Sequence, residues 1–200
     1  MSEQYFVNKP QSKSNPKTWS YKLRGQTFQF VSDVGVFSKN EVDFGSRTLI
    51  DTFQLPSVPG DIIDLGCGYG PIGLTIAKTF PDRQVILSDI NERALELAKG
   101  NAEKNQIKNV SFYLGDRLEA VPRRDYAAIV INPPIRAGKQ TVYQMFEDSY
   151  EALSVNGELW IVIQKKQGAP SAIKKLNEQF RSVEIVKKNK GYFIIKAKKE

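Results

Sequence analysis

The sequence predicts an α/β fold: a mostly parallel, seven-stranded sheet with helices on both faces, the last strand antiparallel, and a short N-terminal β-hairpin extension. From residue 60 onward, short β-rich runs alternate with helical stretches, which is typical of right-handed crossovers between parallel strands. The final runs, 182–188 and 192–198, are joined by a turn too short for a helix, so they must be antiparallel. The 200 residues, 40% of them hydrophobic, suffice for one such domain.

The elements can be placed in chain order. Residues 1–18 are rich in Ser, Asn, Lys, Gln and Pro, and we expect a loosely attached arm. WSYKL and TFQFV alternate apolar and polar residues around Arg24-Gly25, which indicates a hairpin. We expect residues 34–45 to form a lid-like loop, so that 1–44 precede a catalytic domain at 45–200. The expected helices lie near 46–53, 70–80, 91–105, 117–121, 139–153 and 171–180, and the first five strands at 61–65, 84–89, 110–114, 126–131 and 158–164.

The composition excludes several kinds of chemistry. The chain has no histidine and a single cysteine, Cys67, so an internal disulfide, a cysteine-based zinc site and a histidine general base are all ruled out. We expect no metal. No apolar tract approaches the roughly 18 residues of a membrane span, and the N-terminus lacks the apolar region of a signal peptide. We therefore expect a cytoplasmic protein that has no membrane partner.

The net charge of +7 is unevenly placed along the chain. Residues 161–200 hold ten Lys and one Arg against three Glu, so the first 160 residues are close to neutral. Such a basic segment is expected of a nucleic-acid binder, although solvated lysines on outer strands and a helix would give the same count. Charge alone leaves the partner open.

A glycine-rich turn follows the first core strand. The stretch IIDLGCGYGPIG, residues 62–73, ends a strand and opens a helix that carries Pro71 in its first turn. Gly66, Gly68 and Gly70 permit positive φ and close backbone approach, so a ligand can lie against the loop near the helix N-terminus. Dinucleotide-binding enzymes have similar loops, and a purely structural turn is the other alternative.

Three acidic residues sit at strand ends. Asp89 ends the next strand, 23 residues after Gly66, where a carboxylate can accept both hydroxyls of a ribose. Asp116 follows the third strand, where it can accept from an adenine amine or cap a short helix beginning at Arg117. Asp64 precedes the glycines, at a position that is usually apolar in dinucleotide folds. A carboxylate there suits a cationic ligand, which favours S-adenosylmethionine over a pyrophosphate.

The stretch NPPI, Asn132 to Ile135, leaves a buried strand on an asparagine and two prolines. Proline lacks a backbone N–H and restricts the residue before it to extended geometry. Pro133 and Pro134 therefore hold Asn132 and the Pro133 carbonyl in fixed positions at the end of the strand. Both groups are hydrogen-bond acceptors.

These motifs resemble those of class I S-adenosylmethionine-dependent methyltransferases, which have a Rossmann-like fold. DLGCGYG, Asp89, Asp116 and NPPI occur in this order, and GVFSKNEVDFGSRTL and NPPIRAGK narrow the resemblance to the "methyltransferase small" family. That family includes guanine-N2 methyltransferases of small-subunit ribosomal RNA, which often carry two such domains, whereas this chain resembles the catalytic one. The resemblance implies that the cofactor contacts Asp64, Gly66, Cys67, Gly68, Gly70, Asp89, Ile90, Asp116, Arg117 and Asn132.

The resemblance also implies an acceptor and a partner. Asn132 and Pro133 would orient an exocyclic amine of an RNA base, most readily guanine N2, in ribosomal RNA or a small ribosomal subunit. Related enzymes often have an aromatic residue where this chain has Ile135, so Phe37 is the candidate for stacking, although it could equally be core. Further substrate contacts are Lys39 in the lid-like loop and Arg136 and Lys139 after NPPI, which could also be solvated.

Other functions explain less of the sequence. A nicotinamide-dependent oxidoreductase would account for the glycine loop and Asp89 but leaves NPPI and Asp64 unexplained. A function in RNA binding without catalysis would not explain why the cofactor and NPPI motifs are all present. Cys67 lies in the glycine loop, away from NPPI, which argues against methylation of a pyrimidine carbon through a cysteine nucleophile. Protein or small-molecule acceptors stay open, as does the choice between a monomer and a homodimer.

Overall fold

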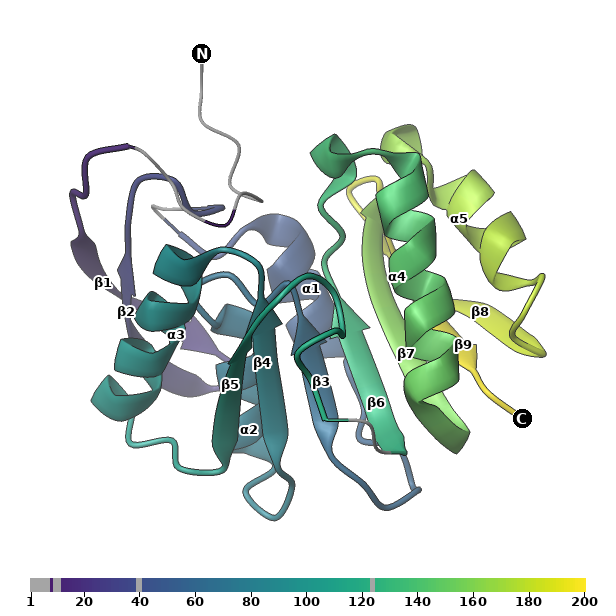
Figure 1. Ribbon diagram of the computed structural model, residues 1–200, viewed down its shortest axis with the longest axis horizontal. Coiled ribbons are helices and arrows are strands. Elements are labelled where there is room, and N and C mark those ends of the chain that lie inside the picture. The colour runs from purple at the N-terminus through teal and green to yellow at the C-terminus, as the bar shows by residue number, and fades with distance from the viewer. Residues whose placement is uncertain (1–7, 9–11, 39–40, 123–124) are drawn as a thin grey trace.

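The computed structural model describes residues 8, 12–38, 41–122 and 125–200, and these form a small and a large sheet flanked by helices (Figure 1). The large sheet has the strand order β5-β4-β3-β6-β7-β9-β8, and β1 pairs with β2 in the small one. The strands of the large sheet are β3 (Ile62–Leu65), β4 (Val85–Asp89), β5 (Val110–Leu114), β6 (Tyr126–Ile131), β7 (Leu153–Gln164), β8 (Ser182–Asn189) and β9 (Tyr192–Lys198).

The directions of the strands confirm the predicted fold class. The strands β5, β4, β3, β6 and β7 are parallel, and β9 runs antiparallel to both of its neighbours, β7 and β8. The chain moves outward from β3 through β4 to β5 and then returns to β6 on the other side of β3. Ligands of open α/β sheets bind at the carboxyl ends of the strands at such a reversal of order. The fold therefore places the candidate site between the ends of β3 and β6.

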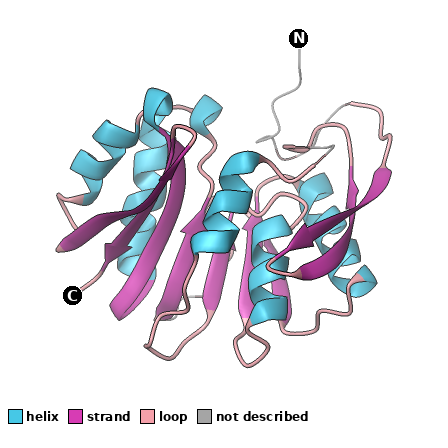
Figure 2. Cartoon of the chain, turned by 180° about the vertical axis from the view of Figure 1, so that it is seen from behind, coloured by secondary structure: helices cyan, strands magenta, loops and turns pink. Residues whose placement is uncertain are grey.

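Helices cover both faces of the large sheet (Figures 1 and 2). Successive residues of a strand point to opposite faces, so Ile62 joins the hydrophobic cluster of the first three helices, whereas Ile63 and Leu65 join the cluster of the last two. One face carries α1 (Phe44–Thr52), α2 (Pro71–Thr79) and α3 (Glu92–Lys104), and the other carries α4 (Lys139–Ala152) and α5 (Ala169–Leu176). None of the helices in the described residues has the length and apolarity needed to cross a bilayer.

The predicted hairpin consists of β1 (Lys17–Leu23) and β2 (Gln26–Ser32), and it packs on α3. Two side-chain amides of α3 bond to the free edge of β2. Asn101 accepts from the backbone N–H of Val31 at 2.7 Å and donates to its carbonyl at 3.0 Å, and Asn105 does the same at Gln29. Because these amides satisfy backbone groups of the edge strand, the hairpin is anchored to the domain.

The described part of the predicted arm is hydrogen-bonded to the domain. The Ser14 hydroxyl and the Asn15 backbone N–H each donate to the Asp33 carboxylate at 2.6 Å. The guanidinium of Arg93, in the first turn of α3, donates to the Ser12 carbonyl at 2.7 Å. Residues 1–7 and 9–11, which make up most of the arm, lie outside the described residues.

The prediction of a helix at 117–121 is wrong. This segment forms consecutive turns, with hydrogen bonds from Glu119 N to the Asp116 carbonyl and from Val121 N to the Leu118 carbonyl. Arg117 has a φ of 48°, a left-handed conformation that interrupts a right-handed helix at its first residue. Asp116 is therefore not a helix cap.

Candidate active site

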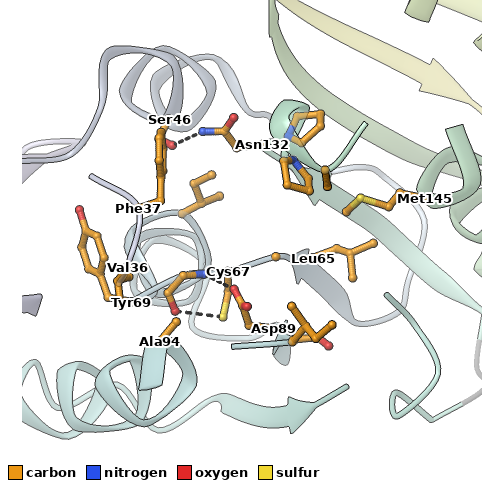
Figure 3. Close-up of a pocket in the computed structure, with 18 of the residues that line it drawn as sticks. Val36, Phe37, Ser46, Leu65, Cys67, Tyr69, Asp89, Ala94, Asn132 and Met145 are labelled. Atoms are coloured by element: carbon orange, nitrogen blue, oxygen red, sulfur yellow. Dashed lines mark hydrogen bonds between the residues drawn. The ribbon is translucent and has the colours of Figure 1, made fainter. Parts of the chain in front are cut away.

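A cavity of about 340 Å³ opens at the carboxyl edge of the large sheet (Figure 3). Its walls come from the segments that follow β3, β4, β5 and β6, together with the loop at 36–38 and the N-terminus of α1. These are the strand ends at which the predicted motifs lie. The predicted residues that line it are Phe37, Gly66, Cys67, Gly68, Asp89, Ile90, Asp116, Arg117, Asn132, Pro133 and Pro134.

The glycine loop presents bare backbone to this cavity. Gly66 and Gly68 have φ values of 77° and 58°, and a Cβ atom built on either would meet no other group within 4 Å. Glycine is favoured here because the backbone is left-handed, and its lack of a side chain leaves room for a ligand. Gly70 is different, because it lies outside the cavity lining and a Cβ there would approach the Leu74 side chain to 2.9 Å.

Asp89 holds the glycine loop and also faces the cavity. One carboxylate oxygen accepts the Gly68 N–H at 2.8 Å and the other accepts the Asn91 N–H at 2.8 Å. Burial raises the pKa of Asp89 to about 6, against the lowering effect of these N–H groups. Each oxygen keeps accepting capacity, so the carboxylate can also receive hydroxyl groups from a ligand.

Asp64 lies behind the glycine loop and does not line the cavity. One of its oxygens accepts the Gly73 N–H at 2.7 Å, and the other is buried without a hydrogen-bond partner among the described residues. Burial, followed by repulsion from Asp89, raises the pKa of Asp64 to about 7. A buried carboxylate with an open oxygen favours a nearby positive charge, which fits a cationic ligand against the loop.

Asp116 and Arg117 form an ion pair at the end of β5. The Arg117 guanidinium contacts the Asp116 carboxylate at 3.1 Å and the Asp148 carboxylate of α4 at 2.9 Å. The pair ties the loop after β5 to α4 and orients Asp116 beside the cavity. In this arrangement Asp116 can accept from a ligand, whereas the Arg117 donors already have acidic partners.

Asn132 lies at the end of β6, and its orientation is fixed from α1 (Figure 3). Its Nδ2 donates to the hydroxyl of the buried Ser46 at 2.9 Å, and the Ser46 backbone N–H donates to the helix-capping Asp43 at 3.0 Å. This bond uses one hydrogen of the amide and orients the group, and Oδ1 accepts no hydrogen bond from the described residues. The Pro133 carbonyl accepts the Ile135 N–H at 2.9 Å and keeps its second lone pair.

Ser46 and Asp43 line the cavity, yet neither was predicted from the sequence. The available signal was an acidic residue three positions before a serine at the start of a helix, which is a capping pattern. That pattern explains Asp43 but does not predict that the serine hydroxyl reaches Asn132, 86 positions later in the chain. Other lining residues that were missed include Tyr69 in the glycine loop and Thr141 and Met145 of α4.

The predicted substrate contacts separate into two groups. Phe37 lines the cavity with 42% of its surface exposed, while the adjacent Val36 is buried. Ile135, Arg136 and Lys139 lie outside the lining, and Ile135 packs toward the cluster of α4 and α5. Lys39 lies outside the described residues.

Cys67 lines the cavity as a neutral thiol. Its sulfur donates to the Gly68 carbonyl at 3.4 Å. Burial, with repulsion from Asp89 and Asp64, raises the pKa of the thiol well above its usual value. A nucleophilic cysteine needs the opposite shift, so this position is unsuited to covalent catalysis.

Comparison with known families identifies the chain. The model of the methyltransferase small domain matches residues 27–196. The chain belongs to this family. Its enzyme class is therefore S-adenosylmethionine-dependent methyltransferase, as the sequence motifs predicted.

Relatives of this methyltransferase differ in length. The uncharacterized protein YbxB of Bacillus subtilis is 59% identical over 200 residues, all of both chains. Ribosomal RNA large subunit methyltransferase G of Klebsiella pneumoniae is 29% identical over 198 residues, which are 95% of this chain and 51% of the relative. The structure of the T. thermophilus 16S rRNA N2 G1207 methyltransferase, in complex with AdoMet and guanosine, has a TM-score of 0.84 at 23% identity. The match covers 96% of this chain and 52% of that one, so this chain spans about half the length of these two proteins.

The residues present fit S-adenosylmethionine. The bare backbone at Gly66 and Gly68 leaves room for the amino-acid part, and the buried carboxylate of Asp64 behind the loop suits its positive charge. Asp89 suits the ribose hydroxyls and Asp116 the adenine amine, because carboxylates accept from such donors. The opposite wall of the cavity, at Asn132, is then left for the methyl acceptor.

Proposed function

We propose that this methyltransferase transfers a methyl group to an exocyclic amine of a base in RNA, most specifically to guanine N2 of small-subunit ribosomal RNA. One observation carries the proposal: Asn132 lines the same cavity as the carboxylates of Asp89 and Asp116, and Ser46 holds its amide with Oδ1 available. An acceptor oxygen in that place fits an NH₂ group.

Asn132 and Pro133 would position the amine rather than activate it through a base. The lone pair of an exocyclic amine is delocalised into the ring, so such an amine is a weak nucleophile. Oδ1 of Asn132 and the carbonyl of Pro133 can each accept one of its hydrogens and so direct the lone pair. Bound S-adenosylmethionine supplies a methyl group on a positively charged sulfur. Positioning of this kind contributes up to about 7–11 kcal/mol in favourable cases.

The proton of the amine can leave to water after methylation. The chain has no histidine, and the Cys67 thiol is neutral, so neither supplies a base or a nucleophile. Phe37, which is partly exposed at the cavity, offers a surface on which a planar base can stack. An aromatic from this loop would replace the one that is absent at Ile135.

The comparisons support an RNA acceptor and leave two ribosomal subunits to be tested. The T. thermophilus protein, similar in fold, is named for guanine N2 of 16S ribosomal RNA and was solved with guanosine. The K. pneumoniae relative is named for the large ribosomal subunit. We favour the small-subunit guanine because the T. thermophilus structure holds guanosine, and the exocyclic amine of guanine fits the acceptor oxygen of Asn132.

The test is transfer of labelled methyl from S-adenosylmethionine to small subunits, large subunits and the naked RNA of each. The wild type and Asn132→Ala are compared, and labelled RNA is digested to nucleosides. We expect label in N2-methylguanosine from the small-subunit RNA, and its loss with Asn132→Ala.

Two outcomes would redirect the proposal. Label confined to large-subunit RNA would keep the chemistry and change the substrate. An absence of label in every RNA, while S-adenosylhomocysteine still binds, would overturn the RNA acceptor and direct the search to protein or small-molecule amines.

A further inference from the structure

The structure separates two groups of cations, and the first consists of three lysines of the basic C-terminal segment. Lys175 pairs with Glu147 and Glu178, and Lys196 pairs with Glu158 and Glu184. The ammonium of Lys199 donates to the carbonyls at the C-terminus of α4. This first group neutralises acids or caps a helix and needs no external partner.

The second group lies at the edge where the cavity opens. It consists of Arg136 in η1 (Ile135–Ala137), Lys139 at the start of α4, Lys165 and Lys166 in η2 (Lys165–Gln167), and Lys190 in the turn between β8 and β9. All five side chains are exposed, and none forms an ion pair within the part of the chain that the structure describes. We call these five residues the basic edge.

Chain neighbours and short contacts connect the basic edge to the acceptor side of the cavity. Arg136 precedes the cavity-lining Ala137. The ammonium of Lys190 lies 5.1 Å from the ring centroid of Phe44, the residue after the cavity-lining Asp43. The Lys165 backbone N–H donates to the Gly191 carbonyl at 2.8 Å, which joins η2 to the β8–β9 turn. Figure 1 shows η1, η2 and this turn at the same edge of the large sheet.

We propose that the basic edge binds the phosphates of the RNA on either side of the target nucleotide. This inference rests on the proposed function, because it assumes an RNA acceptor and assigns the surface that binds it. Exposed cations without acidic partners suit a phosphate backbone, and each phosphate contact releases counterions. The acidic residues Asp89 and Asp116 lie at the other end of the cavity, so the charge would also direct the RNA toward Asn132.

The basic edge would hold the RNA while the target base enters the cavity. The cavity of this chain lies within the part that matches about half the length of the K. pneumoniae and T. thermophilus proteins. A base becomes accessible to Asn132 only when it is unpaired or flipped out. Phosphate contacts beside the cavity would hold the flanking strand during that step.

The test compares two triple variants with matched charge loss. Lys165→Gln/Lys166→Gln/Lys190→Gln removes three cations of the basic edge. The control, Lys17→Gln/Lys104→Gln/Lys108→Gln, removes three exposed lysines placed at the start of β1, at the end of α3 and before the amino end of β5. Binding of a fluorescein-labelled single-stranded RNA of mixed sequence is measured against salt, and S-adenosylhomocysteine affinity reports on the cavity.

We expect the basic-edge variant to lose about tenfold or more in RNA affinity at low salt and to reduce the slope of log K against log salt by about 2, at about 0.7 per phosphate. The control should behave as the wild type, and all three proteins should bind S-adenosylhomocysteine equally. Equal losses of RNA affinity in both triple variants would overturn the assignment of the basic edge as the RNA-binding surface. The proposed function would then still stand.

Two further outcomes separate the inference from its premise. If the wild-type protein bound S-adenosylhomocysteine but neither bound nor methylated RNA, the premise of an RNA acceptor would be wrong. Poly-glutamate that competes as strongly as unlabelled RNA would overturn the RNA assignment in favour of an acidic protein partner.

Discussion

The two ends of the cavity are assembled in different ways. At the cofactor end, the ligand-facing groups follow three adjacent strands, β3, β4 and β5, and the Asp89 carboxylate ties one strand end to the next through the Gly68 N–H. At the acceptor end, Asn132 follows β6 but takes its orientation from Ser46 of α1, and Phe37 arrives on a loop before that helix. The cofactor end thus depends on local motifs, whereas the acceptor end depends on the packing of distant segments.

Asn132→Ala should give the largest effect, and this effect should be confined to the acceptor end of the cavity. Loss of the oriented amide is expected to lower kcat for methyl transfer by about 100-fold or more, because misplacement of a reacting group by about 1 Å can cost that much. The affinity for S-adenosylhomocysteine should change little, since the Asp89 and glycine-loop contacts remain. Single-turnover methylation and calorimetry measure the two quantities.

Asn132→Asp serves as the matched control for this prediction. It keeps the size of the side chain and an acceptor oxygen but removes the Nδ2 donor to Ser46. We expect an intermediate rate. If Asn132→Ala lowered the affinity for the cofactor as much as it lowered the rate, the two ends of the cavity would not act independently.

Asp89→Asn should break the cofactor end. The amide cannot accept from Gly68, Asn91 and a ribose as the carboxylate does, and hydrogen bonds to a charged group contribute about 1.5–3 kcal/mol. S-adenosylhomocysteine affinity should therefore fall about 10- to 100-fold. The rate at saturating cofactor should fall less, which is the reverse of the Asn132→Ala pattern.

The same carboxylate predicts a pH dependence. The pKa of Asp89 is raised to about 6, and the ionised form is the one that accepts ribose hydroxyls. Lowering the pH through this value protonates Asp89, and the proton must then be released when the cofactor binds. The affinity for S-adenosylhomocysteine should therefore drop by up to about tenfold for each further pH unit. Calorimetric titration across this range would contradict the assignment if the wild type and Asp89→Asn showed the same profile.

The contrast between the two ends also explains what could be predicted from the sequence. The alternation of strands and helices, the antiparallel last pair and the hairpin were predicted correctly because periodicity and turn residues are local signals. The helix at 117–121 was wrong because its composition permitted a helix while Arg117 adopts a left-handed turn. Ser46 was missed because its contact to Asn132 depends on how α1 packs against the end of β6.

Ser46→Ala tests the packing dependence of the acceptor end with a smaller expected effect. Removing one hydrogen bond from the Asn132 amide should lower kcat about 2- to 12-fold, which corresponds to about 0.5–1.5 kcal/mol. The Michaelis constant for S-adenosylmethionine should stay near the wild-type value. Ser46→Thr retains the hydroxyl and should restore most of the rate.

Ser149→Ala is the matched control for a generic loss of stability. Ser149 is also a buried serine, but its hydroxyl donates to the Met145 carbonyl within α4. We expect its kcat to equal that of the wild type. If both alanine variants lowered kcat to the same degree, Ser46 would be a structural residue only.

Cys67→Ala should have the smallest effect, although Cys67 lies in the cavity wall between Gly66 and Gly68. Its thiol is neutral because burial and the neighbouring carboxylates raise its pKa, and a covalent mechanism would need the thiolate. We expect methyl transfer to stay within about twofold of the wild type, since no bond to sulfur forms during attack by an amine. A large loss of rate with cofactor affinity retained would contradict direct transfer to nitrogen. The measured product would then have to be examined for methylation at a pyrimidine carbon, because that reaction uses a cysteine nucleophile.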